Sequence, residues 1–72
     1  MSVHQLFHKT AFSPEEIAVL VIAYEATLKK LALVDRDDPL TRMVAKKIIE
    51  LAERGVRDPG QLAGLTVNEM RL

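Results

Sequence analysis

The chain has 72 residues with ten basic and ten acidic side chains, so its formal net charge is zero, and it contains no Cys. This length is that of one domain, and the missing Cys excludes disulfides and Cys-based zinc sites. A neutral balance lacks the basic footprint of nucleic-acid-binding proteins, so we do not expect a nucleic acid as partner. A fold this small without disulfides or metal depends on regular helices or on oligomerisation.

Neither a targeting segment nor a membrane-spanning segment is expected. Residues 1–12 contain no apolar run of the length that a signal peptide requires. The longest uncharged apolar run, residues 17–24, is far shorter than the ~20 residues needed to cross a bilayer. We therefore expect a cytoplasmic protein with no membrane contact.

The first eleven residues leave two interpretations open. Ser2 and Gln5 have capping-box spacing. Val3, Leu6 and Phe7 would share one side of a two-turn helix. Such a short helix is stable only when it docks on other structure, and the second apolar stripe of the following helix is one place for it. The alternative is a flexible terminus.

The clearest helix-start signal in the chain lies at Ser13. Its hydroxyl can accept a hydrogen bond from an amide of the first turn. Pro14 suits the first helical position because its missing N–H costs nothing there. Glu16 completes a capping box, and Phe12 and Ile17 have the spacing of a hydrophobic staple.

The helix predicted over residues 14–34 is apolar on two faces. One face follows the helical period and is predicted to point into the core; it comprises Ile17, Leu20, Val21, Tyr24, Leu28 and Leu31. A second stripe lies opposite and comprises Val19, Ile22, Ala26 and Leu33. A helix that is apolar on two sides must be covered on two sides. The second stripe is therefore predicted either to face another part of a small bundle or to form a homodimer interface.

A second helix is predicted over residues 39–54. Asp38 is the favoured N-cap because Pro39 follows it, and Gly55 can take the left-handed conformation that ends a helix. The predicted buried face comprises Leu40, Val44, Ile48 and Leu51, widened by Ala45 and Ala52. The short linker before this helix predicts that the two long helices are antiparallel neighbours.

The C-terminal segment begins with the same helix-start pattern, an Asp followed by a Pro. Asp58 is the predicted N-cap, Pro59 the first helical residue, and Gln61 takes the capping-box position. Leu62, Leu65 and Met70 are the apolar anchors of this element. It is either one helix over residues 59–70 or two short turns, because Gly60 and Gly64 weaken a helix and Thr66 with Glu69 has capping-box spacing.

Two groups of side chains have the spacing of metal ligands but lack the rest of a site. His4 and His8 would share one helix face, but the Glu of a metalloprotease motif is absent between them. Asp35, Asp37 and Asp38 are followed by Pro39, where a calcium loop needs further ligands and a glycine. No nucleophile elbow or phosphate loop is present. We predict no metal, cofactor, small-molecule substrate or enzymatic activity.

The last two elements also allow a DNA-binding interpretation. A helix, a glycine turn and a second helical element follow one another, as in a helix-turn-helix. In that arrangement Arg54, Arg57 and Arg71 would contact phosphates. Few basic side chains lie on the helix that would read the bases, so we keep a small transcriptional regulator as the alternative function.

Three short patterns make the chain similar to a known group of proteins. They are Phe12, Pro14 and Glu15; Ile48, Ile49, Glu50, Leu51 and Ala52; and Gly55, Arg57, Asp58, Pro59 and Leu62. Over residues 12–65 the chain resembles small stand-alone bacterial helical proteins with no assigned function. The resemblance implies a helical fold and supplies no activity. Arg57 is the matching residue that neither capping nor core packing requires. It is expected to bond the C-terminal carbonyls of the second helix, to pair with an acid or to contact a partner.

The sequence thus predicts a single all-α domain over residues 1–72. The expected core comprises Ile17, Leu20, Val21, Tyr24, Leu28, Leu31, Leu40, Val44, Ile48, Leu51, Leu62 and Leu65. The leading functional hypothesis is a non-enzymatic interaction module that forms a homodimer, or binds a protein partner, through Val19, Ile22, Ala26 and Leu33.

Overall fold

The computed structural model describes Phe7, residues 10–33 and residues 39–70. These residues form three helices, α2 (Pro14–Lys30), α3 (Pro39–Glu53) and α4 (Pro59–Met70), and contain no strand. The predicted all-α class is therefore confirmed for the described part of the chain. Some predictions concern residues outside this part of the chain. They are the short helix at Ser2 to Leu6, the pair His4 and His8, the aspartates of the 35–38 linker with Asp38 as N-cap, and Arg71.

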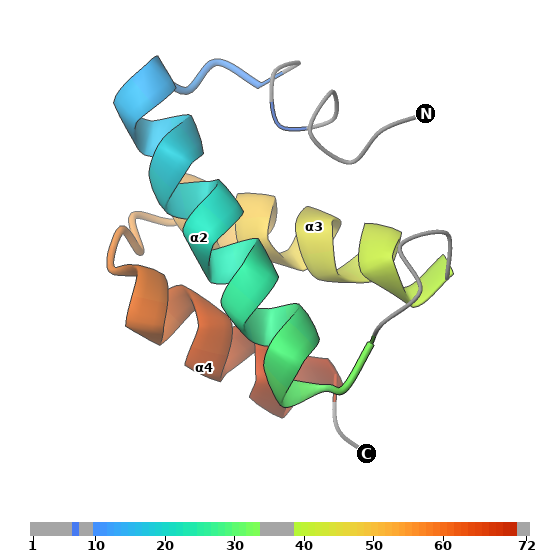
Figure 1. Ribbon diagram of the computed structural model, residues 1–72. Helices are drawn as coiled ribbons and strands as arrows, with labels where there is room; N and C mark the ends of the chain where they lie inside the picture. The colour runs from blue at the N-terminus through green and yellow to red at the C-terminus, as the bar shows by residue number, and fades with distance from the viewer. Residues whose placement is uncertain (1–6, 8–9, 34–38, 71–72) are drawn as a thin grey trace.

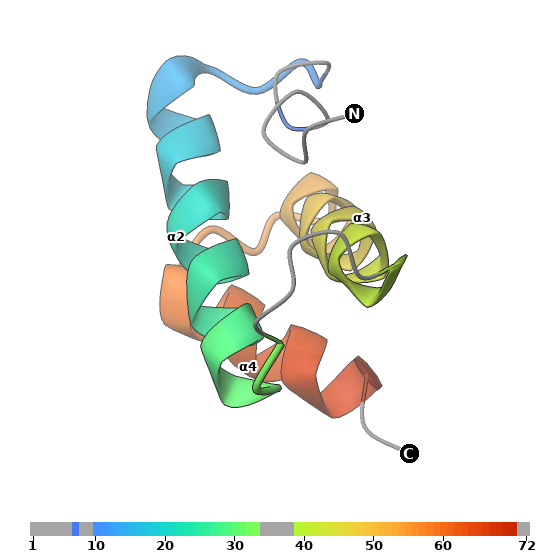
Figure 2. The ribbon, with the colours of Figure 1, turned by 45° about the vertical axis from the view of Figure 1, so that its right-hand side comes forward.

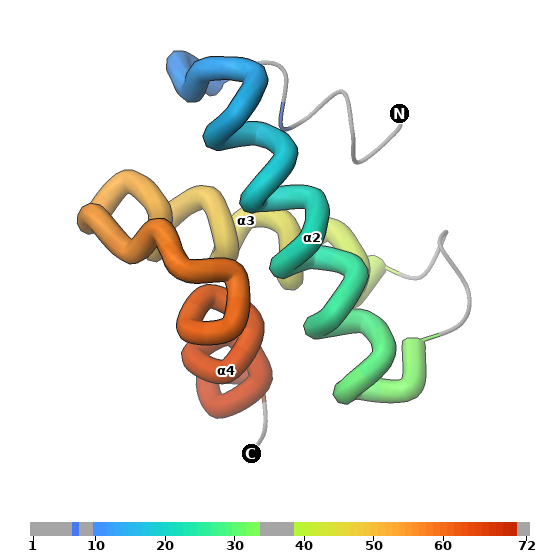
Figure 3. Tube along the Cα trace, turned by 60° about the vertical axis from the view of Figure 1, so that its left-hand side comes forward, coloured from blue at the N-terminus to red at the C-terminus, as the bar shows by residue number. Residues whose placement is uncertain are grey.

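The three helices pack against one another in every pairing. Figures 1 and 2 show α2 crossing α3 obliquely, so the predicted antiparallel pairing of the first two helices is not confirmed. In both views α3 and α4 run in roughly opposite directions. Figure 3 shows that the connection between them is short, so α4 starts beside the end of α3.

Helix α2 begins as the sequence predicts and ends earlier. The Ser13 hydroxyl accepts from the Glu16 N–H at 3.2 Å, and the Ser13 N–H donates to the Glu16 carboxylate at 2.9 Å, which completes the capping box. The helix stops at Lys30 because Ala32 takes a left-handed conformation with φ 57°. The Ala32 N–H then bonds the Lys29 carbonyl and the Leu33 N–H bonds the Leu28 carbonyl, which is a Schellman motif.

Helix α3 ends with the same motif, built on the predicted glycine. Gly55 has φ 104°, and its N–H donates to the Ala52 carbonyl. The Val56 N–H donates to the Leu51 carbonyl at 3.1 Å. Val56 packs against the core, so the chain is turned sharply toward the start of α4.

Helix α4 is a single helix, which decides between the two interpretations of the C-terminal segment. The Asp58 carboxylate accepts from the Gln61 N–H at 2.9 Å, as expected of the predicted N-cap. Pro59 is its first residue and the helix continues to Met70 without a break at Gly64 or Thr66. Thr66 therefore lies inside a helix and caps none.

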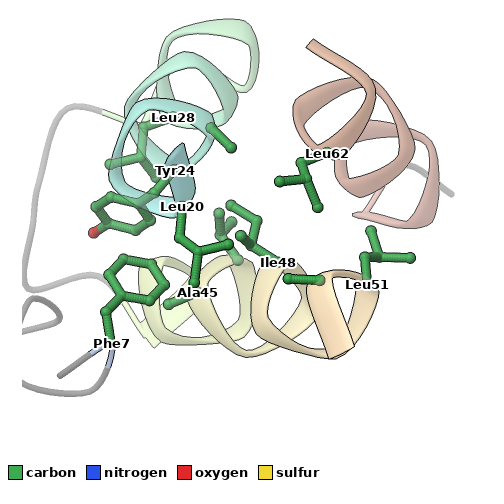
Figure 4. Close-up of a cluster of buried hydrophobic side chains, with 11 residues drawn as sticks. Phe7, Leu20, Tyr24, Leu28, Ala45, Ile48, Leu51 and Leu62 are labelled. Atoms are coloured by element: carbon green, nitrogen blue, oxygen red, sulfur yellow. The ribbon is translucent and has the colours of Figure 1, made fainter. Parts of the chain in front are cut away.

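The core fills the space between the three helices (Figure 4). Seven predicted core residues are buried: Leu20, Tyr24, Leu28, Val44, Ile48, Leu51 and Leu62. Ile17, Val21 and Leu31 are half-buried and pack against this core. The helical period in the sequence thus placed the centre of the core correctly.

Leu40 and Leu65 were wrongly assigned to the core, since both are 42% exposed. On each helix a threonine takes the buried position beside the predicted leucine. Thr41 is buried in α3 and Thr66 in α4. Ala45 and Ala52 are buried, as predicted for the widened face of α3. Three small residues that the sequence did not assign to the core are buried as well: Ala23, Thr27 and Ala63.

Phe7 shows where the described part of the N-terminal segment docks. Its side chain is fully buried, and its ring meets the edge of Tyr24 with centroids 5.7 Å apart and planes at 78° (Figure 4). Thr10 holds the Phe7 carbonyl with its hydroxyl at 2.6 Å and its N–H at 3.2 Å. Phe7 therefore contacts the core side of α2 and does not cover Ile22 on the opposite side.

Candidate functional site

The outward side of α2 carries the largest exposed apolar side chain of that helix. Ile22 is 57% exposed, whereas Leu20 and Tyr24, two residues away on either side, are buried. A single exposed isoleucine is ordinary on a protein surface. What singles Ile22 out is the row of residues around it.

The four predicted interface residues do not form one equally accessible stripe. Val19 is half-buried and packs against the core. Leu33, which closes the Schellman motif at the end of α2, also packs against the core. Ala26 is half-buried. Ile22 is thus the one residue of this set with a largely exposed side chain.

A straight row of exposed residues runs along α2 through Ile22. Glu15 lies seven residues before it and Lys29 seven residues after it, and both are exposed. Seven residues are about two helical turns, so the three side chains lie on nearly the same side of the helix. Ala18 and Ala26 lie one turn before and after Ile22. Neither Glu15 nor Lys29 makes an ion pair with another described residue. We call Glu15, Ala18, Ile22, Ala26 and Lys29 the outer seam of α2.

Arg57 lies beside the start of this seam and ties the α3–α4 turn to α2. Its guanidinium pairs with the Glu16 carboxylate at 2.8 Å and lies over the Phe12 ring, 4.8 Å from its centroid. Glu16 is the same residue that closes the capping box with Ser13. The structure confirms the expectation that Arg57 pairs with an acid.

These contacts lower the pKa of Glu16. The largest cause is the hydrogen bond from the Ser13 N–H, followed by the Ser13 hydroxyl, and the Arg57 charge adds to both. Partial desolvation opposes this shift without reversing it. Glu16 is therefore held in its charged form, in which it can serve the capping box and the ion pair together.

Two open hollows flank Arg57. One of about 240 Å³ lies against α2 and is lined by Glu15, Glu16, Val19, Leu20 and Arg57. The other, of about 660 Å³, is lined by Thr10, Ala11, Phe12, Glu16, Glu53 and Arg57. Glu16 and Arg57 line both and already neutralise each other, so neither hollow presents an unpaired charge of either residue to a ligand.

The other exposed apolar side chains lie in different surroundings. Met43, 54% exposed on α3, has the exposed Leu40 one turn before it and Lys46 and Lys47 one turn after it. Leu65, on α4, has Gln61 and Glu69 as its neighbours one turn away. Unlike Ile22, neither is flanked by small residues at both ends.

The arginines expected to meet phosphates in a helix-turn-helix are engaged with acids where the structure describes them. Arg54 pairs with Glu50 one turn earlier, and Arg57 pairs with Glu16. From Pro59 to Met70, α4 carries no Lys or Arg. The observed surface therefore gives no support to the DNA-binding alternative.

The described residues form neither a metal-ligand cluster nor a membrane-spanning helix. In the part of the chain that the structure describes, no three His, Cys, Asp or Glu side chains converge as metal ligands would. None of the described helices combines the length and apolar character of a membrane span.

Comparisons with protein-family models, with curated proteins and with solved structures give no match to this chain. The resemblance to small bacterial helical proteins therefore stays a prediction. The candidate site is identified by its own geometry, as the outer seam of α2 with Ile22 at its centre.

Proposed function

We propose that this chain is a non-enzymatic protein-interaction module that self-associates through the outer seam of α2. The observation that carries the proposal is Ile22, an exposed branched apolar side chain in the middle of α2. The small side chains of Ala18 and Ala26 on either side would let another helix approach closely. A cytoplasmic location and a protein rather than a nucleic acid as partner belong to the same proposal.

The size of the seam sets the expected strength of the association. A 17-residue helix is roughly 25 Å long, and one such face buries less than the roughly 800 Å² per partner of a standard stable interface. We therefore expect a reversible association with a dissociation constant in the micromolar range or weaker. The corresponding free energy of binding is about −8 kcal/mol or weaker.

Sedimentation equilibrium over a range of concentrations up to about 1 mM tests the proposal. The wild-type mass should rise with concentration, and Ile22→Glu should remain monomeric, because two glutamates would meet where two isoleucines pack. Met43→Glu is the matched control, since it adds the same charge at an equally exposed apolar position on α3. Circular dichroism should show both variants folded. A wild-type protein that stays monomeric and folded throughout would disprove self-association.

A further inference from the structure

From the charges of the outer seam we propose that two copies of this chain pair their α2 helices antiparallel, about a two-fold axis at Ile22. The inference rests on the proposed self-association and names its geometry. Glu15 stands near the start of α2, Lys29 stands near its end, and both are the same seven-residue distance from Ile22.

A two-fold axis at Ile22 fixes which residues face each other. Each residue before Ile22 faces the residue at the same distance after Ile22 in the partner copy. Glu15 of one copy then meets Lys29 of the other, and the contact occurs twice. Ala18 meets Ala26 in the same way, so small residues lie on both sides of the central pair of isoleucines.

The parallel alternative is disfavoured by the same residues. It would place Glu15 against Glu15 and Lys29 against Lys29 of the second copy. Like charges that lie directly opposite each other repel. The seven-residue spacing of Glu15, Ile22 and Lys29 also suits two helices that wrap gently around each other. The seam is therefore self-complementary in one orientation only.

The face around Met43 does not offer a second copy the same fit. A two-fold contact centred on Met43 would set Lys46 and Lys47 of one copy against Leu40 and Pro39 of the other, so neither lysine would meet an acid. The charge pattern thus selects α2 rather than α3 as the helix at the contact.

Charge exchange tests the orientation. Glu15→Lys and Lys29→Glu should each weaken the dimer, roughly tenfold at low salt, because each variant turns two attractive pairs into two repulsive ones. The double variant Glu15→Lys with Lys29→Glu restores both pairs and should return to wild-type affinity. In a parallel dimer the single variants would leave the number of like-charge pairs unchanged. High salt should shrink the differences.

Cross-linking gives a second and independent readout. Because the chain contains no Cys, Ala18→Cys and Ala26→Cys each introduce a single thiol. With a short bis-maleimide, a mixture of the two variants should cross-link residue 18 to residue 26 far more than either variant cross-links to itself. Preferential linkage of 18 to 18 and 26 to 26 would overturn the antiparallel arrangement.

The outcomes separate this inference from the proposed function. An association that is lost in Ile22→Glu but indifferent to the charge exchanges would leave self-association standing and refute the antiparallel geometry. Absence of association in the wild-type chain would refute both.

Discussion

Among the described residues, one buried hydroxyl has no hydrogen-bond partner. Thr66 Oγ1 is fully enclosed in α4 and bonds nothing, whereas the Thr27 hydroxyl, equally buried in α2, donates to the Ala23 carbonyl at 2.7 Å. A buried polar group without a partner costs about 1–3 kcal/mol. The same residue type therefore contributes differently at two positions of the same core.

Thr66→Val should stabilise the fold by about 1–2 kcal/mol, because it removes the unsatisfied hydroxyl and adds a buried methyl of nearly the same shape. Thermal or urea unfolding followed by circular dichroism measures the change. Thr27→Val is the matched control and should be neutral or destabilising, since its hydroxyl is bonded. Equal stabilisation by both variants would show that the missing hydrogen bond is not the cause.

The small buried residues explain which core positions the sequence could not reveal. Predictions from periodicity rank side chains by apolar character, so they chose Leu40 and Leu65 over the adjacent Thr41 and Thr66. Where helices cross closely, a short side chain fits and a leucine does not. The polar appearance of threonine in the sequence conceals this role.

At the scale of whole helices, α2 and α3 end with the same hydrogen bonds on different residues. Gly55 occupies the left-handed position at the end of α3, and Ala32 occupies it at the end of α2. A left-handed conformation costs an L-residue roughly 1–2 kcal/mol and costs glycine little. Helix α2 is held to this ending because Leu33, the next residue, packs against the core.

Ala32→Gly should therefore stabilise the protein. Relief of the left-handed strain exceeds the added flexibility of the unfolded chain, and we expect a gain of about 0.5–1 kcal/mol, which is a rise in Tm of a few degrees in a chain of this size. Differential scanning calorimetry measures it. The mirror experiment is Gly55→Ala, which should cost about 1 kcal/mol or more. An added Cβ there meets no atom within 4 Å, so any loss comes from the backbone alone.

The ends of the elements show how far local sequence specifies this fold. The N-caps at Ser13 and Asp58 and the glycine ending at Gly55 depend on neighbouring residues alone, and all three were predicted correctly. The end of α2 at Lys30 was not, because no glycine marks it and the core contact of Leu33 decides it. The candidate site divides in the same way: the exposed position of Ile22 follows from helical periodicity, whereas the burial of Leu33 follows from tertiary packing.

At the scale of the whole molecule, the single chain has the surface area of a compact monomer. Its accessible surface is 4617 Å², close to the roughly 4500 Å² expected for a monomeric protein of this mass. Self-association through the outer seam would thus join two chains that are each already compact. This is why a charged residue at position 22 is expected to separate the copies and leave each one folded.

The ion pair between Glu16 and Arg57 joins parts of the molecule that are far apart in the sequence, the start of α2 and the α3–α4 turn. The sequence left an acidic partner for Arg57 as one of three alternatives and could not name the acid, since the contact depends on how the helices cross. The pKa of Glu16 is lower in the folded chain than in the unfolded chain. The unfolded chain therefore binds more protons in acid, and the stability that Glu16 contributes is present at neutral pH and lost as the pH falls through its folded pKa.

Glu16→Gln removes the negative charge that Glu16 presents to the Ser13 N–H and to Arg57, while glutamine can still accept the Ser13 N–H in a capping box. At neutral pH the variant should melt at a lower temperature than the wild type. This difference in melting temperature should shrink once the pH falls below roughly 4.3, the pKa of an unperturbed glutamate. It should vanish as the pH falls through the lower pKa of Glu16 in the folded chain. Both side chains are partly exposed, at 38% for Glu16 and 47% for Arg57, so high salt should also reduce the difference in melting temperature.

Glu15→Gln is the control. It removes a charge from the same helical turn without breaking an ion pair among the described residues, and its melting temperature should differ less from wild type as the pH changes. A difference in melting temperature between wild type and Glu16→Gln that stays constant from pH 3 to pH 7 would show instead that the charge of Glu16 does not stabilise the fold through Ser13 or through Arg57.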